Sequence, residues 1–160
     1  MSGKRLILSL VAMAALLAAV PASATTPAQT EYKEKVEPIC KANTEANEKI
    51  LKGVRQKVKA GKYDAAAKQF TAAAKALKKT RAQLAAVPKP AEDEAKLTKW
   101  LGYAKTETQL FETIAKKLHN DEATAAQKMV VRLVSTARQA NNQVLEYEFR
   151  YCRFQPSKFI

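Results

Sequence analysis

Apolar side chains recur at every third or fourth position through most of the chain after residue 31, which is the spacing of amphipathic helices. The pattern predicts four helices. The first covers residues 32–59, and the second follows a turn at Gly61 with Asp64 as its expected N-cap. The prolines of VPKP end the second helix, the acids of AEDEA suit the start of the third, and HNDEA forms the turn before the fourth.

These connections are short, so neighbouring helices are expected to run antiparallel, which predicts an all-α fold, an up-down-up-down four-helix bundle. In that topology the first helix begins at the end where the fourth finishes. Cys40 and Cys152 then meet, and we expect one disulfide to close the N- and C-terminal helices. The aromatic tail YEFRYCRFQPSKFI is expected to form a hydrophobic plug over this end, with a ligand platform as the alternative.

Residues 1–24 have the features of a secretory signal peptide: the basic start MSGKR, an apolar stretch from Leu6 to Val20, and the cleavage site Ala22-Ser23-Ala24. A retained N-terminal anchor is the alternative. We expect residues 25–31 to be a disordered N-terminus and residues 32–160 to form the bundle with its tail. Later apolar runs are too short to span a bilayer, which predicts a secreted or extracytoplasmic protein of the cell envelope, where a disulfide persists.

Residue types that carry catalysis are scarce after residue 24. His119 is the one histidine, and Ser135 and Ser157 are the two serines. The predicted helices separate these groups and also place His119 far from both cysteines, so neither a serine nor a cysteine nucleophile has a base within reach. No glycine-rich loop is present to hold a phosphate group. The sequence predicts a protein without enzymatic activity, catalytic residues or cofactor.

A turn near the end of the third predicted helix holds His119, Asp121 and Glu122, which offer three metal ligands. The second histidine or the paired cysteines of a zinc site are missing. The alternative, which we favour, is a histidine facing the negative end of one helix dipole and acids at the start of the next helix. We therefore predict no metal site.

Several polar residues occupy positions on the predicted apolar stripes, in the half of the bundle nearest the cysteines. They are Asn43, Asn47, Thr80 and Asn141. Buried amides need hydrogen-bond partners, and a polar layer often fixes the register of a helical bundle. A small-molecule site formed by these residues is the alternative interpretation.

Positive charge is concentrated in one part of the chain. The whole chain carries +13, and +11 remains once Lys4 and Arg5 leave with the signal peptide. Residues 49–90 account for that entire excess. This asymmetry suggests that the first hairpin binds a polyanion, either an anionic lipid surface or a cell-wall polymer, through faces that carry Lys52, Arg55, Lys59, Lys68, Lys75 and Lys79. Nucleic acid is less expected, because the hairpin has few aromatic residues for base stacking.

The other interpretation, which we favour, is an exported, non-enzymatic bundle with a structural or interaction role, whose charge is simply solvated. The stretch AGKYDAAAKQFTAAAKAL resembles the second half of a tetratricopeptide unit, but no second copy follows at the required period. Taken together, the signal peptide, EPICKANTEAN, VPKP and YCRFQPSKF resemble the corresponding parts of exported helical-bundle proteins of high-GC Gram-positive bacteria. This resemblance implies an exported helical protein and brings no known activity.

Overall fold

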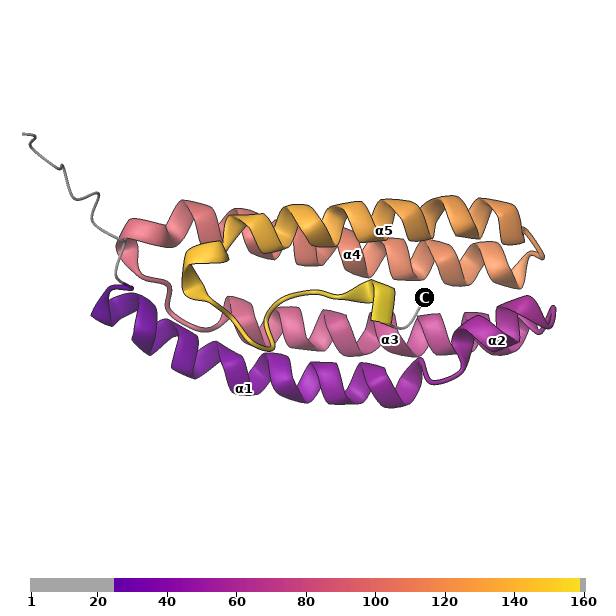
Figure 1. The fold of residues 1–160 in the computed structure, drawn as a ribbon, viewed down its shortest axis with the longest axis horizontal. Helices are drawn as coiled ribbons and strands as arrows, with labels where there is room; N and C mark the ends of the chain where they lie inside the picture. The colour runs from indigo at the N-terminus through magenta and orange to yellow at the C-terminus, as the bar shows by residue number, and fades with distance from the viewer. Residues whose placement is uncertain (1–24, 159–160) are drawn as a thin grey trace, which may run out of the picture.

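The computed structural model describes residues 25–158, and all of its regular elements are helical (Figure 1). The α-helices are α1 (Pro27–Ile50), α2 (Val54–Lys59), α3 (Tyr63–Ala85), α4 (Glu94–His119) and α5 (Ala123–Gln143). Three 3₁₀ turns are η1 (Ala91–Asp93), η2 (Leu145–Tyr147) and η3 (Pro156–Lys158). The predicted all-helical fold is therefore confirmed for this part of the chain, while the predicted signal peptide and Phe159 of the aromatic tail lie outside the described residues. Within residues 25–158 no helix combines the length and apolar character needed to cross a membrane.

The first predicted helix differs from the structure at both ends. Residues 27–31 are helical rather than disordered, because Thr26 and Gln29 form a reciprocal capping box: the Thr26 hydroxyl accepts from the Gln29 N–H, and the Gln29 side chain accepts from the Thr26 N–H. The helix then stops after Ile50, and a separate helix α2 begins at Val54. Gly53 between them has a φ of 72°, a left-handed conformation that interrupts the helix.

The turn into α3 is made by Gly61, as predicted, with a φ of 68°. The prediction that Asp64 caps this helix is wrong. The N-cap position is Lys62, and Asp64 lies in the first turn. Its Oδ1 is 2.8 Å from Nδ1 of His119, the last residue of α4, so Asp64 links the start of α3 to the end of α4.

The long helices pack in series, α1 on α3, α3 on α4 and α4 on α5. Direct contact between α1 and α5 is minor within the described residues. We call residues 148–158 the C-terminal segment. After α5 and η2, this segment turns back along the bundle (Figure 1, yellow), so that η3 packs against α5.

The core consists of two clusters. One lies around Phe70 and Phe111, whose ring centroids are 5.8 Å apart. The other surrounds Trp100 and includes Phe149, whose ring stacks on Trp100 and on Tyr147. Two aromatic residues of the tail, Tyr147 and Phe149, are thus buried as expected for a plug. Tyr151 and Phe154, which follow them, are only half-buried.

The predicted disulfide between Cys40 and Cys152 is confirmed. The two sulfur atoms are 2.01 Å apart and the two Cα atoms 5.0 Å apart. The bridge joins α1 to the C-terminal segment rather than to α5 itself, because Cys152 lies beyond the end of that helix. It therefore holds the returning segment against α1.

Candidate ligand-binding cavity

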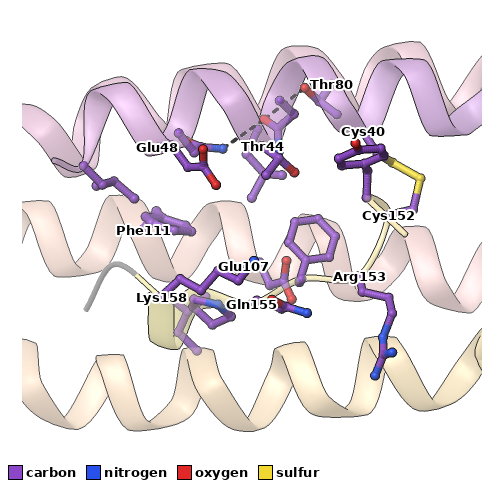
Figure 2. Close-up of a pocket in the computed structure, with 18 of the residues that line it drawn as sticks. Cys40, Thr44, Glu48, Thr80, Glu107, Phe111, Cys152, Arg153, Gln155 and Lys158 are labelled. Atoms are coloured by element: carbon purple, nitrogen blue, oxygen red, sulfur yellow. Dashed lines mark hydrogen bonds between the residues drawn. A yellow bond between two sulfur atoms is a disulfide. The ribbon is translucent and has the colours of Figure 1, made fainter. Parts of the chain in front are cut away.

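A cavity of about 360 Å³ lies beneath the C-terminal segment. Its walls come from α1, α3, α4, α5 and the segment itself, and the Cys40–Cys152 disulfide forms part of one wall. Figure 2 shows Glu48 of α1, Glu107 and Phe111 of α4, and Gln155 and Lys158 of the segment around this space. The apolar part of the lining consists of Leu51, Leu77, Leu84, Phe111, Leu133 and Phe154.

Glu107 is the most unusual residue in the lining. It occupies the inner face of α4, one turn before Phe111, and only 1% of it is exposed. Neither carboxyl oxygen has a hydrogen-bond partner. Burial raises the pKa of Glu107 well above its ordinary value, because a charged carboxylate is poorly solvated in such surroundings. These surroundings therefore favour the protonated, neutral form of the side chain.

Asp93 provides a comparison within the same molecule, since it is the other buried acid of the described residues. Its carboxyl group accepts hydrogen bonds from Gln29 (2.7 Å), Lys96 (2.7 Å) and the Tyr147 hydroxyl (2.7 Å). Burial by itself would raise the pKa of Asp93, but these hydrogen bonds outweigh it and hold the pKa below its ordinary value. Asp93 is thus a satisfied structural acid, whereas Glu107 is not.

A polar network joins α1 to α3 on another wall of the cavity. Asn43 Oδ1 accepts from the Thr80 hydroxyl (3.1 Å) and from Asn47 Nδ2 (3.0 Å). All three residues line the cavity, and Asn47 Oδ1 is buried without a partner. The network connects the two helices, as the register interpretation expects, and it also leaves an acceptor oxygen at the cavity wall. Three of the four polar residues found in the sequence therefore belong to one site.

The fourth, Asn141, does not line the cavity but holds its cover. Its amide donates to the Phe154 carbonyl and accepts from the Phe154 N–H, each at 2.9 Å. On the other side, the Glu37 carboxylate accepts from the N–H groups of Arg150 (2.6 Å) and Tyr151 (3.0 Å). Together with the disulfide, these contacts tie the C-terminal segment to both α1 and α5.

Charged side chains also contribute to the lining. Arg150, Arg153 and Lys158 come from the C-terminal segment, and Glu48 comes from α1; all four are exposed. The residues that α3 and α5 contribute to the cavity carry no charge. Glu107 is therefore a lone acid in the interior, with solvated charges of both signs outside it.

The six basic residues predicted to bind a polyanion are all exposed. Lys68, Lys75 and Lys79 follow one stripe of α3, opposite its buried face. Arg55 and Lys59 instead line a smaller cavity of about 150 Å³, together with residues of α4 and α5. The structure thus divides the set among the outer stripe of α3, a groove beside α2 and, for Lys52, the turn between α1 and α2, and polyanion binding stays a prediction.

The candidate metal ligands in the turn after α4 contact other side chains. His119 lies against Asp64, and Glu122 forms an ion pair with Lys117 (2.6 Å). Across residues 25–158, no three histidine, cysteine, aspartate or glutamate side chains are grouped so that they would hold a metal ion.

Sequence reasoning missed Glu107, although a signal was present. Glu107 lies three residues after Ala104 and four before Phe111, so it falls on the apolar stripe of its helix. An acid at such a position is expected to be buried, which makes it a candidate functional group.

Comparison of the chain with protein families, curated proteins and solved structures finds no match. A function is therefore inferred from the cavity and its lining residues.

Proposed function

We propose that this protein is a non-enzymatic, extracytoplasmic binding protein whose small-molecule ligand occupies the cavity beneath the C-terminal segment. The observation that carries this proposal is the cavity of about 360 Å³ with the unpartnered, buried carboxyl group of Glu107 in its wall. An apolar pocket with a few unsatisfied polar groups is the usual form of a small-molecule site.

An unpartnered acid in the interior lowers the stability of the folded protein. A buried polar group without a partner destabilises a folded protein by about 1–3 kcal/mol, and a leucine or methionine at position 107 would avoid that cost. Asp93 demonstrates that this fold surrounds a buried acid with donors where the acid is structural. The missing donors at Glu107 are then best supplied by a ligand.

The proposal includes the extracytoplasmic location of the protein and the topology of its helix bundle. Residues 1–24 would direct export, and an oxidising compartment would preserve the disulfide. The serial packing of the long helices and their short connections support the up-down-up-down four-helix bundle. The C-terminal segment would close this bundle between α1 and α5.

The test uses the fluorescence of 1-aminonaphthalene, a small neutral probe whose emission responds to an apolar environment. We expect saturable binding to the protein with its disulfide intact. Leu133→Phe adds bulk to the cavity wall and should weaken binding about tenfold or more. Leu110→Phe is the matched control, because Leu110 is partly buried but does not line the cavity. Equal binding by both variants, with helicity retained, would place the probe elsewhere and remove the proposed site.

Polyanion binding by the first hairpin is the second candidate function, and the exposure of all six basic residues favours it. Replacing them with glutamine should abolish retention on anionic vesicles at low salt and leave helicity intact. Unchanged retention would exclude these residues, namely Lys52, Arg55, Lys59, Lys68, Lys75 and Lys79.

A further inference from the structure

The unpartnered polar atoms of the cavity share one property. They are both oxygens of Glu107 and Oδ1 of Asn47, and each acts as a hydrogen-bond acceptor when Glu107 is ionised. Three acceptors without donors require a ligand that brings N–H or O–H groups. A primary ammonium group carries three N–H donors and no acceptor, which matches this set.

The absence of a counter-ion at Glu107 also favours a cation. Arg150, Arg153 and Lys158 line the cavity, yet neither oxygen of Glu107 receives a hydrogen bond from them. Glu48 is the other acid in the lining and is exposed. Since α3 and α5 contribute only uncharged residues, Glu107 remains without a counter-ion in the interior. A buried carboxylate gains most from a cation that is placed directly against it.

We propose that the ligand is a primary amine with an apolar chain, whose ammonium group binds Glu107 and Asn47 while its chain packs among the leucines and Phe111. This inference rests on the proposed ligand-binding function. A volume of about 360 Å³ accommodates roughly twelve non-hydrogen atoms, taking the ~30 Å³ that one water molecule occupies in the liquid. An alkylamine of about ten carbons therefore fits.

Binding exchanges one positive charge for another. In the unliganded protein burial favours the protonated carboxyl group of Glu107, and the entering ammonium group replaces that proton. The proton leaves to solvent, and the N–H groups donate to the resulting carboxylate. The interior thus stays neutral overall, and the affinity for the amine rises with pH until Glu107 is ionised in the unliganded protein as well.

The exposed cations around the cavity oppose the approach of a positively charged amine. Arg153 and Lys158 repel it, and added salt screens this repulsion. Salt should therefore leave amine binding unchanged or strengthen it slightly. Amine adsorption to exposed acids would instead weaken with salt.

The experiment compares three ligands of matched length by isothermal titration calorimetry on the disulfide-bonded protein: decylamine, decanol and decanoate. We expect decylamine to bind at least about tenfold more tightly than decanol, as for a hydrogen bond to a charged group, and decanoate to bind most weakly. Glu107→Gln should remove the preference for the amine and change decanol affinity less than about threefold. Glu112→Gln, which alters an exposed acid of α4 outside the lining, should preserve the preference.

A second readout is proton release, obtained from titrations in buffers of different ionisation enthalpy. Decylamine should release up to one proton per molecule from the unaltered protein and none from Glu107→Gln. Equal affinities of decylamine and decanol for the unaltered protein, or an unchanged amine preference in Glu107→Gln, would overturn the cation assignment while leaving the cavity as a binding site. If none of the three ligands and no 1-aminonaphthalene binds, the proposed function itself fails. Should Glu107→Gln not fold, the ligand comparison and the proton release of the unaltered protein still decide the question.

Discussion

Replacing Glu107 with glutamine should stabilise the folded protein, by an amount that grows with pH. The substitution keeps the size and shape of the side chain and removes its ionisation. Because burial raises the pKa of Glu107 in the folded state, the unfolded chain loses this proton at a lower pH than the folded protein does. The unaltered protein therefore loses stability as the pH rises from the unfolded pKa to the folded pKa.

The size of the effect follows from proton linkage. Below about pH 4.5, the ordinary value for glutamate, both states are protonated and the contribution of Glu107 is fully present. Above that pH, the free energy of unfolding falls by about 1.4 kcal/mol for each pH unit, until the folded protein also ionises. A glutamine side chain at this position does not ionise and has no such loss. The difference between the two proteins should therefore widen by about 1.4 kcal/mol per unit within this window.

The assay is urea denaturation followed by far-UV circular dichroism, at constant ionic strength and at several pH values from 4 to 7. Glu48→Gln is the control, because it removes an exposed carboxyl group from the same cavity and leaves the buried one in place. If the curves of the unaltered protein and Glu107→Gln run parallel, Glu107 titrates normally in the folded state. The carboxyl group would then be solvated or paired, and the reasoning for the ligand site would fail.

Four further predictions concern the rest of the molecule. Replacing Cys40 and Cys152 with serine should lower the free energy of unfolding by about 4–5 kcal/mol in the chain-entropy view, since 112 positions separate them, and urea titration measures this loss. The same change should weaken the binding of 1-aminonaphthalene, followed by its fluorescence, but retain helicity. Asp93→Ala removes the acceptor of Gln29 and of the Tyr147 hydroxyl, while Lys96 keeps Glu146, and should lower the free energy of unfolding by about 2–3 kcal/mol, measured by thermal unfolding; an unchanged midpoint would contradict the network. Asn141→Ala should accelerate hydrogen exchange in the C-terminal segment but not in α3, and equal protection in both proteins would argue against the clamp. The exported protein should begin at or near Thr25, and N-terminal sequencing that finds residue 1 retained would refute the signal peptide.

Features that depend on neighbours along the chain could be predicted from the sequence. The helical spacing of apolar residues predicts the helices, and Gly61 marks a turn because it adopts a left-handed conformation without strain. The residues of the Thr26–Gln29 capping box are also local, so the helical start of α1 was predictable in place of a disordered segment. Gly53 was harder to interpret, because a single glycine within a helical pattern is tolerated or breaks the helix according to what packs beside it.

The sequence also placed Asn43, Asn47 and Thr80 on inward-facing stripes, and their hydrogen bonds and shared cavity agree with that position. It could not distinguish a structural acid from an unpartnered one. Asp93 receives one donor from Lys96, three residues away, but the other two come from α1 and η2, which are distant along the chain, whereas Glu107 receives none.

The path of the C-terminal segment was decided by tertiary structure alone. Its short sequence has no periodic pattern that sets a direction, and it runs back over the cavity because Glu37 and Cys40 on one side and Asn141 on the other supply partners for its backbone and its cysteine. Local propensity acts over a few residues, but burial and hydrogen-bond satisfaction depend on every element that surrounds a group. For that reason the sequence determines the helices and the two partners of the disulfide, whereas only the packed structure creates the cavity and leaves Glu107 inside it without a donor.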